Sequence, residues 1–115
     1  MIGFVMVGTN ELETINLKRA VTNEKYAGYS SKERPEDIEF YVTIPANKEK
    51  ATFGNGVQIS FIVNSKETVD KFYNLGIKLG GKDEGGPGIR PSGEYYCYLR
   101  DLDGNKICAF AKINN

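Results

Sequence analysis

The chain has 115 residues, 40% of them hydrophobic and 26% charged, which is enough for one globular domain and too few for two ordinary ones. Its 15 basic and 15 acidic side chains cancel to a formal net charge of zero, so no bulk positive field attracts nucleic acid or an anionic membrane. No apolar run approaches the ~20 residues of a membrane-spanning helix. We expect a single domain, residues 1–115, without nucleic acid or membrane as a partner.

The absence of histidine restricts the chemistry further. Imidazole is a usual ligand of catalytic zinc and iron, and acid–base enzymes favour the same side chain. A metal ion would have to be held here by carboxylate, tyrosine, cysteine or backbone oxygen. We expect neither a metal nor another cofactor.

The beginning of the chain predicts a buried strand over residues 2–7 and then a short helix. Thr9 or Asn10 can cap a helix from Glu11, with acidic residues in its first turn. Strand-forming residues start again at Ala20. The apolar start has no basic leader and no small-residue cleavage site, so we interpret it as a strand and not as a signal peptide, and we expect a cytoplasmic protein.

The next segments predict strands over residues 26–30 and 38–44, separated by a polar loop. In the second of these, apolar and polar side chains alternate: Ile38, Phe40 and Val42 share one face, and Glu39, Tyr41 and Thr43 share the other. Residues 51–53 could add a short strand before the Gly54-Asn55-Gly56 break.

The second half begins with an alternating strand over residues 57–63, in which Gln58, Ser60 and Ile62 oppose the apolar positions. Ser65 can then cap the best helix of the chain, which Gly76 or Gly80 can end. The apolar face of this helix consists of Val69, Phe72, Tyr73 and Leu75.

We interpret residues 80–88 as a glycine-rich loop, followed by strands over residues 94–100 and 106–113. An Asp-Gly turn joins these strands, because it supplies positive φ at little cost. Cys97 and Cys108 lie in the two strands. A disulfide is possible, but two buried thiols are the favoured interpretation.

The elements occur in the order strand, short helix, strands, and then strand, long helix, strands. This order indicates two copies of one unit, a first module of about residues 1–53 and a second of about 54–115. The copies repeat as a pattern and not as a sequence.

Four segments follow this order: VMVGTNELE (5–13), ATFGNGVQISFIVNSKETVDKFY (51–73), GGKDEGGPGIRP (80–91) and RDLDGNKICAF (100–110). Through them the chain resembles the glyoxalase / bleomycin-resistance / extradiol-dioxygenase superfamily, also called vicinal oxygen chelate proteins. The resemblance covers essentially the whole chain and is closest to small uncharacterised glyoxalase-like bacterial proteins. It implies an α+β fold of two βαβββ modules that form a curled mixed sheet around a concave pocket, usually in a dimer.

The resemblance also implies where a metal would bind. Metal-dependent members have histidines at the positions of Phe4 and Gln58, a glutamate at that of Cys108, and a fourth ligand at Tyr41 or, as second choice, Glu39. Phenylalanine has no donor atom, and a neutral glutamine is a poor ligand for zinc or nickel. This set does not predict a metal site.

From the resemblance, the polar strand faces should line the pocket. Glu39 could be a general base if apolar walls disfavour its charge, or it could be exposed or ion-paired. The thiol of Cys108 has no histidine to activate it, so a small packed side chain is the default. Arg90 could meet an anionic ligand at the pocket mouth, or it could pair with Asp83 or Glu84. The expected pocket residues are Phe4, Met6, Glu39, Tyr41, Gln58, Ser60, Arg90, Cys108 and Phe110.

The chain departs from the family after Ile15, where the family continues its first helix for roughly three more turns. Here Asn16 follows directly. Either the natural protein has a short helix, or a mobile helix end belongs between Ile15 and Asn16 and is absent from the printed sequence. We favour the second explanation, because a shorter helix would expose the outer face of the sheet with Val5 and Val7.

The leading functional hypothesis is a homodimer that binds a small organic molecule in a metal-free pocket. In the family this resembles the bleomycin-resistance members, which hold a ligand in an aromatic-lined groove at the dimer interface. The alternative is an enzyme, either a lactoylglutathione lyase or dioxygenase by homology, or one with metal-free chemistry through Glu39 or Tyr41. A third possibility is a structural dimer whose pocket is filled by Phe4, Met6 and Phe110.

Overall fold

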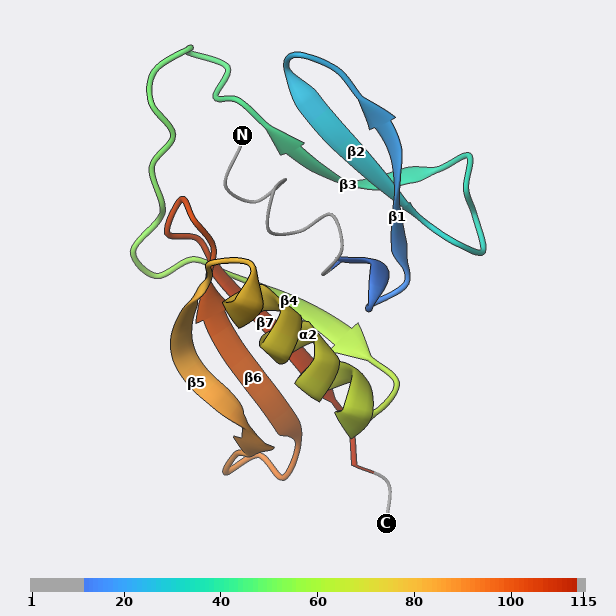
Figure 1. Ribbon diagram of the computed structural model, residues 1–115, viewed down its shortest axis with the longest axis vertical. Coiled ribbons are helices and arrows are strands. Elements are labelled where there is room, and N and C mark those ends of the chain that lie inside the picture. Colours follow the sequence, from blue (N-terminus) through green and yellow to red (C-terminus); the bar gives the residue numbers. More distant parts are fainter. Residues whose placement is uncertain (1–11, 114–115) are drawn as a thin grey trace.

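The computed structural model describes residues 12–113, and its elements carry the labels of Figure 1. The strand expected over residues 2–7, its flanking caps, and the pocket residues Phe4 and Met6 lie outside this range. In chain order the elements are β1 (Leu17–Thr22), β2 (Tyr26–Ser31), β3 (Ile38–Thr43), β4 (Gln58–Val63), α2 (Lys66–Lys78), β5 (Lys82–Ile89), β6 (Tyr95–Arg100) and β7 (Lys106–Ala111).

The strands form two sheets that follow one another along the length of the molecule (Figure 1). The first has the antiparallel order β1-β2-β3. The second has the order β4-β7-β6-β5, in which β4 runs parallel to β7 and the other pairs are antiparallel. The described chain is therefore α+β, with a curled and unclosed mixed sheet, as predicted. Where one module ends and the next begins stays a prediction.

Helix α2 forms where the capping signals predict it. The Ser65 hydroxyl accepts a hydrogen bond from the Thr68 N–H at 3.1 Å, and an acidic residue occupies the first turn. The helix ends at Lys78, and Gly80 follows with φ of 108°. Of the two glycines that were predicted to end the helix, Gly80 does so, whereas Gly76 is buried within the helix.

The segment 80–88 corrects the sequence prediction, because most of it is strand β5 and not a loop. It pairs with β6, and its register shifts between Asp83 and Gly85 and again between Gly85 and Gly88. Such bulges suit glycine, and Gly85 has φ of 155°. Residues 51–53 form no strand, so that expectation was wrong.

The turn before β1 is short. The Ile15 N–H donates to the Leu12 carbonyl at 3.1 Å, and Asn16 takes the left-handed conformation with φ of 72°, which asparagine tolerates. Strand β1 then starts at Leu17, earlier than the predicted Ala20, because it pairs with β2 from that residue. The absence of residues between Ile15 and Asn16 from the printed sequence stays a prediction.

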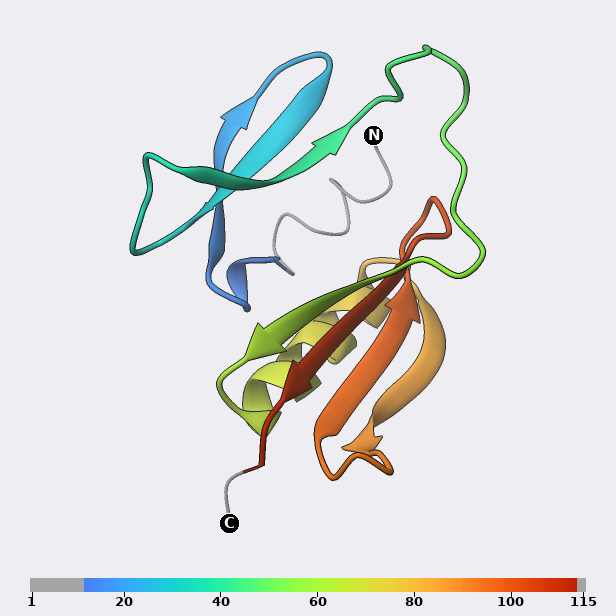
Figure 2. The ribbon, with the colours of Figure 1, turned by 180° about the vertical axis from the view of Figure 1, so that it is seen from behind.

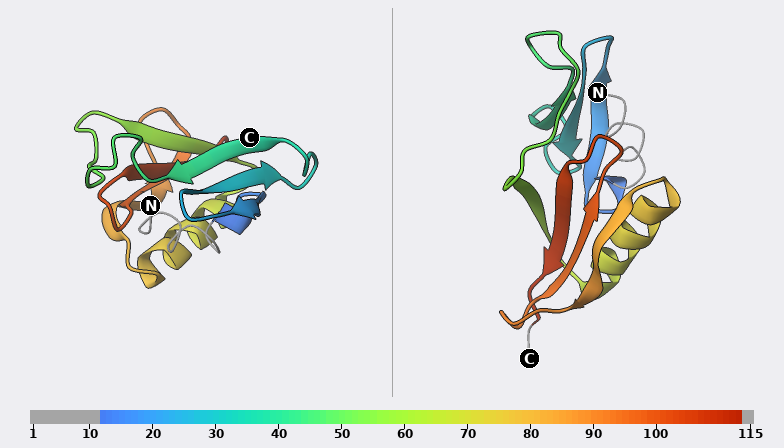
Figure 3. Two further views of the ribbon diagram at one scale, coloured as in Figure 1. Left: turned by 90° about the horizontal axis from the view of Figure 1, so that it is seen from above. Right: turned by 90° about the vertical axis from the view of Figure 1, so that its left-hand side faces the viewer.

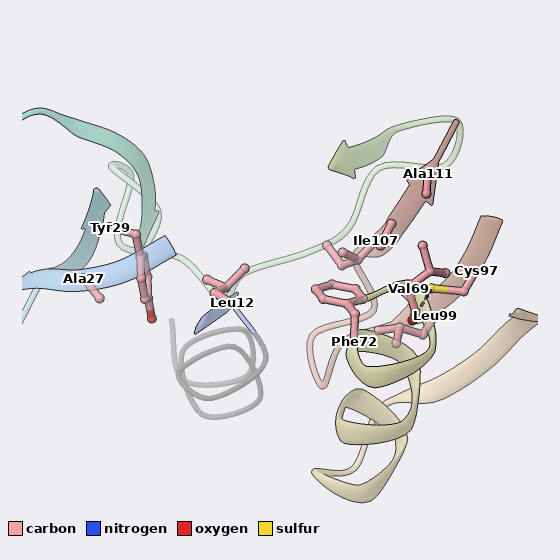
Figure 4. Packing of buried hydrophobic residues seen from close by; sticks show 10 residues of the cluster. Leu12, Ala27, Tyr29, Val69, Phe72, Cys97, Leu99, Ile107 and Ala111 are labelled. Carbon is pink, nitrogen blue, oxygen red and sulfur yellow. Dashed lines mark hydrogen bonds between the residues drawn. The ribbon is translucent and has the colours of Figure 1, made fainter. Parts of the chain in front are cut away.

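Helix α2 packs on one face of the four-stranded sheet (Figure 3, right). Phe72 and Val69 insert from the helix into a row of buried side chains from β6 and β7 (Figure 4). Phe40 of the first sheet contacts Phe61 of the second edge to face, with ring centroids 5.4 Å apart. The buried cluster comprises Leu12, Ala27, Tyr29, Val69, Phe72, Cys97, Leu99, Ile107, Ala109 and Ala111. Within the described residues, no helix has the length and apolarity needed to cross a membrane.

Candidate ligand-binding face

The four-stranded sheet has a second face, opposite α2, which we call the open face (Figure 2). Within residues 12–113, α2 is the only element that makes extensive contacts with this sheet, and it does so from the other side. Because side chains alternate along a strand, the register fixes which residues share the open face. They are Gln58, Ser60, Ile62, Tyr96, Tyr98, Arg100, Lys106, Cys108 and Phe110.

Three of these side chains form a line of nearly parallel rings, which we call the aromatic row. The rings of Phe110 and Tyr96 are 4.8 Å apart with an interplanar angle of 10°. Those of Tyr96 and Tyr98 are 5.8 Å apart at 12°. All three are partly exposed, so the row presents aromatic surface to solvent.

Two cations lie against the Tyr98 end of the row. The guanidinium carbon of Arg90 is 5.4 Å from the Tyr98 ring centroid, and Nζ of Lys106 is 5.2 Å from it. Within residues 12–113 the ion pairs are Arg34–Glu39 and Arg100–Glu84, so neither of these two cations has a carboxylate partner there. The expected alternative, Arg90 paired with Asp83 or Glu84, is not formed.

The glycines of β5 explain how Arg90 reaches this position. A Cβ atom at Gly88 would lie 3.0 Å from Nη1 of Arg90, and one at Gly85 would lie 3.2 Å from Nη2. The guanidinium thus occupies space that any side chain at these positions would restrict. Nη2 also donates a hydrogen bond to the Gly86 carbonyl at 2.7 Å. The glycine-rich segment therefore provides the space in which the Arg90 side chain lies.

Cys108 lies on the open face but is fully buried beneath its neighbours. Burial raises the pKa of its thiol, while a hydrogen bond with Ser60 and the charges of Arg90 and Lys106 act in the opposite direction. The net upward shift keeps the thiol protonated at neutral pH. Gln58 completes this small polar cluster by donating from Nε2 to the Ser60 hydroxyl at 2.8 Å. The default interpretation of Cys108 as a packed side chain fits this environment better than a nucleophile does.

The two candidate catalytic residues lie in the other sheet. Glu39 pairs with Arg34 at 3.4 Å, and 36% of its side chain is exposed. Tyr41 is 55% exposed and packs edge-on against Tyr26, with ring centroids 5.4 Å apart. The open face brings together the other described pocket candidates, which are Gln58, Ser60, Arg90, Cys108 and Phe110.

The hollows of the surface lie mainly between the sheets. One of about 360 Å³ and one of about 280 Å³ share Ile15, Asn16 and Ile62, and Glu39 borders the smaller. A third of about 420 Å³ is lined largely by the segment that links the sheets. None of these three touches the aromatic row or its two cations. We assign the candidate site to the open face because the aromatic row and both cations lie there.

Sequence reasoning did not assign Tyr96, Tyr98 or Lys106 to the site. The run of tyrosines in β6 places aromatic rings on both faces, so the run alone does not say which ones matter. The register of the Asp-Gly hairpin shows which tyrosines belong to the site. It pairs Tyr96 with Phe110 and Tyr98 with Cys108, and these pairs share a face.

Residues 12–109 match the family model of the Glyoxalase/Bleomycin resistance protein/Dioxygenase superfamily. The chain belongs to this superfamily.

Solved structures of the superfamily agree. A glyoxalase/bleomycin resistance protein from Albidiferax ferrireducens T118 is 36% identical, covering 96% of this chain and 84% of its own, with a TM-score of 0.79. A lactoylglutathione lyase from Agrobacterium tumefaciens is 16% identical, covering 92% and 83%, with a TM-score of 0.59, and shows the shared fold alone. No curated protein matches the chain.

The metal of other superfamily members does not fit the side chains present here. At the corresponding positions, Gln58 offers a neutral amide that is bonded to Ser60, and Cys108 offers a protonated thiol. Tyr41 belongs to the other sheet, and Phe4, outside the described range, has no donor atom. Residues 12–113 contain no cluster of three or more histidine, cysteine, aspartate or glutamate side chains suited to a metal.

Proposed function

We propose that this superfamily member binds a small organic molecule on its open face, without the metal chemistry of its relatives. The proposal rests on the aromatic row and on the two cations beside it, which lack carboxylate partners within the described residues. Aromatic surface supplies affinity for an organic ligand, and the cations supply orientation. The similar protein from Albidiferax ferrireducens is described as a glyoxalase/bleomycin resistance protein, which is compatible with either binding or catalysis.

Catalysis through Glu39 or Tyr41 receives less support. A general base with a useful pKa needs an environment that disfavours its charge, whereas Glu39 is partly exposed and paired with Arg34. Lactoylglutathione lyase or dioxygenase chemistry would need the metal donors that the corresponding positions lack.

We also propose that the protein is a cytoplasmic homodimer. Val57 and Ile62, at and beside strand β4, are 62% and 61% exposed, and Ile89 is 64% exposed. Contacts between two copies would remove such apolar surface from water. Light scattering coupled to size-exclusion chromatography measures the mass directly, and a monomer at micromolar concentration contradicts the dimer.

The function is tested by metal analysis of the purified protein, a lactoylglutathione lyase assay with added zinc or nickel, and a thermal-shift screen of small molecules. We expect substoichiometric metal, no turnover, and some ligands that raise Tm. A ligand at a hundred times its Kd stabilises by about 2.7 kcal/mol. Stoichiometric metal with turnover would overturn the proposal.

Two tyrosine variants locate the ligand. Tyr96→Ala removes the middle ring of the aromatic row and should abolish the shift in Tm. Tyr41→Ala removes a partly exposed ring from the other sheet and should preserve it. The opposite pattern would move the binding site to the first sheet.

A further inference from the structure

The open face carries more information than the presence of a ligand. We propose that the ligand is a small aromatic carboxylate, with its carboxylate between Arg90 and Lys106 and its ring on the aromatic row. This inference rests on the proposed function above and specifies the class of molecule.

The charge balance of the open face favours an anion. Arg90 and Lys106 both lie against Tyr98 and have no carboxylate partner within residues 12–113. The acidic side chain of Glu84 is already paired with Arg100, 2.6 Å away. Cys108, which is paired in register with Tyr98, remains a neutral thiol and adds no negative charge. A carboxylate would thus find two positive charges that no described group neutralises.

Arg90 is held in position before any ligand arrives. Its guanidinium lies over the glycines of β5, with Nη1 3.0 Å from the ideal Cβ position of Gly88. Its Nη2 donates to the Gly86 carbonyl, which leaves most of its N–H groups available. A planar fork that is fixed in advance suits a carboxylate and loses less entropy on binding.

The aromatic row specifies the other part of the ligand. Phe110, Tyr96 and Tyr98 are nearly parallel and partly exposed, so a planar ring beside the two cations can pack edge to face against them. A saturated ring is not planar and has no aromatic edge or face, so it would make a poorer contact with the aromatic row.

The probes are benzoate, benzyl alcohol and cyclohexanecarboxylate, titrated into the whole protein by calorimetry and by amide NMR. Benzyl alcohol keeps the ring without the charge, and cyclohexanecarboxylate keeps the charge without the planar ring. We expect benzoate to bind about tenfold more tightly than either, since a hydrogen bond to a charged group is lost with the alcohol and the aromatic contact is lost with the saturated ring.

The variants Gly88→Ala and Gly86→Ala form the matched pair. A methyl group at residue 88 would press on Arg90, whereas at residue 86 the nearest atom is the Tyr73 hydroxyl, 3.9 Å away. Gly88→Ala should shift the guanidinium and weaken benzoate by about threefold while leaving benzyl alcohol unchanged, and Gly86→Ala should bind as the wild type does. Arg90→Gln should weaken benzoate at least as much as Gly88→Ala does, while Arg34→Gln, a change in the loop between β2 and β3, should have no effect.

Two results would overturn the inference in different ways. If benzyl alcohol shifts the Tyr96 and Phe110 signals as strongly as benzoate does, and Arg90→Gln changes neither, the ligand class is wrong but the proposed function stands. If no probe perturbs the open face, the ligand class is again wrong. In that case a negative thermal-shift screen would remove the proposed function as well.

Discussion

The two faces of the four-stranded sheet differ sharply although the same strands build both. On the face covered by α2, Cys97, Leu99, Ile107, Ala109 and Ala111 are all fully buried. On the open face, the aromatic row and its two cations keep part of their surface in contact with solvent. Because side chains alternate along each strand, successive residues belong in turn to the core of the domain and to its candidate binding surface.

This separation means that neighbours in sequence should behave as opposites in experiment. Tyr95 and Tyr96, or Cys97 and Tyr98, are adjacent in β6 but belong to different faces. Changes toward α2 should alter the stability of the fold, and changes on the open face should alter ligand binding. Each of the following experiments compares one residue from the α2 side of the sheet with one from the open face.

The largest difference is expected in the reactivity of the two thiols. Cys97 lies beneath α2, with its Sγ 3.8 Å from the Val69 carbonyl, whereas Cys108 points to the open face, away from α2. Labelling of Cys97 should need near-global unfolding, which for a stability of at least ~5 kcal/mol slows it by about a thousandfold or more relative to the unfolded chain. Cys108 should be labelled earlier, through local opening.

Time-resolved labelling with mass spectrometry of the peptides measures both rates, and labelling in urea is the control. The same experiment examines the disulfide alternative. Cys97 and Cys108 form no disulfide in the described chain and point to opposite faces, so we expect two labels per chain without a reductant. Equal rates for the two thiols would show that the open face is as well covered as the core.

The next largest difference concerns two phenylalanines. Phe72 is fully buried between α2 and the sheet, and Phe72→Ala should lower the free energy of unfolding by about 3–5 kcal/mol. Phe110 is only partly buried at the end of the aromatic row, and Phe110→Ala should cost about 1 kcal/mol. Urea titration gives both values. Equal losses would mean that the open face is a second core, as in a dimer with no ligand.

The sequence predicted those parts of the fold whose signals are local. Alternation identified β3 and β4, Ser65 identified the start of α2, and the Asp-Gly turn identified the last hairpin. These signals work because cap, turn and pleat chemistry involve residues that are close together in the chain.

Strand β5 could not be recognised in this way. Its glycines have no side chains, so no apolar alternation exists, and the strand forms because its backbone pairs with β6. For the same reason the position of Arg90 was open, since it depends on space above Gly85 and Gly88 that only the folded sheet creates. Sequence and family resemblance together placed Gln58, Ser60, Cys108 and Phe110 near one another, but the stacking of Tyr96 on Phe110 needed the register.

The smallest expected difference separates Tyr95 from Tyr96. The Tyr95 hydroxyl donates to Asp70 of α2 at 2.7 Å, and this hydrogen bond, together with burial, raises the pKa of Tyr95 from 10.0 to about 12. The pKa of Tyr96 is also raised, chiefly by burial, and its hydroxyl meets Glu94 only at 3.4 Å. Loss of the Asp70 bond in Tyr95→Phe should cost about 1 kcal/mol at pH 7, and Tyr96→Phe should cost less.

The pH dependence follows from the direction of the shift. Because the folded state holds the Tyr95 proton more tightly than the unfolded state does, this residue contributes its full stability below about pH 10 and loses it as the pH rises towards 12. Tyr95→Phe should therefore flatten the alkaline fall in the free energy of unfolding between pH 10 and pH 12, measured by urea titration, more than Tyr96→Phe does. If the two variants flatten this alkaline fall equally, the hydrogen bond between β6 and α2 stabilises the fold no more than Tyr96 on the open face does. The two faces would then not differ at this position.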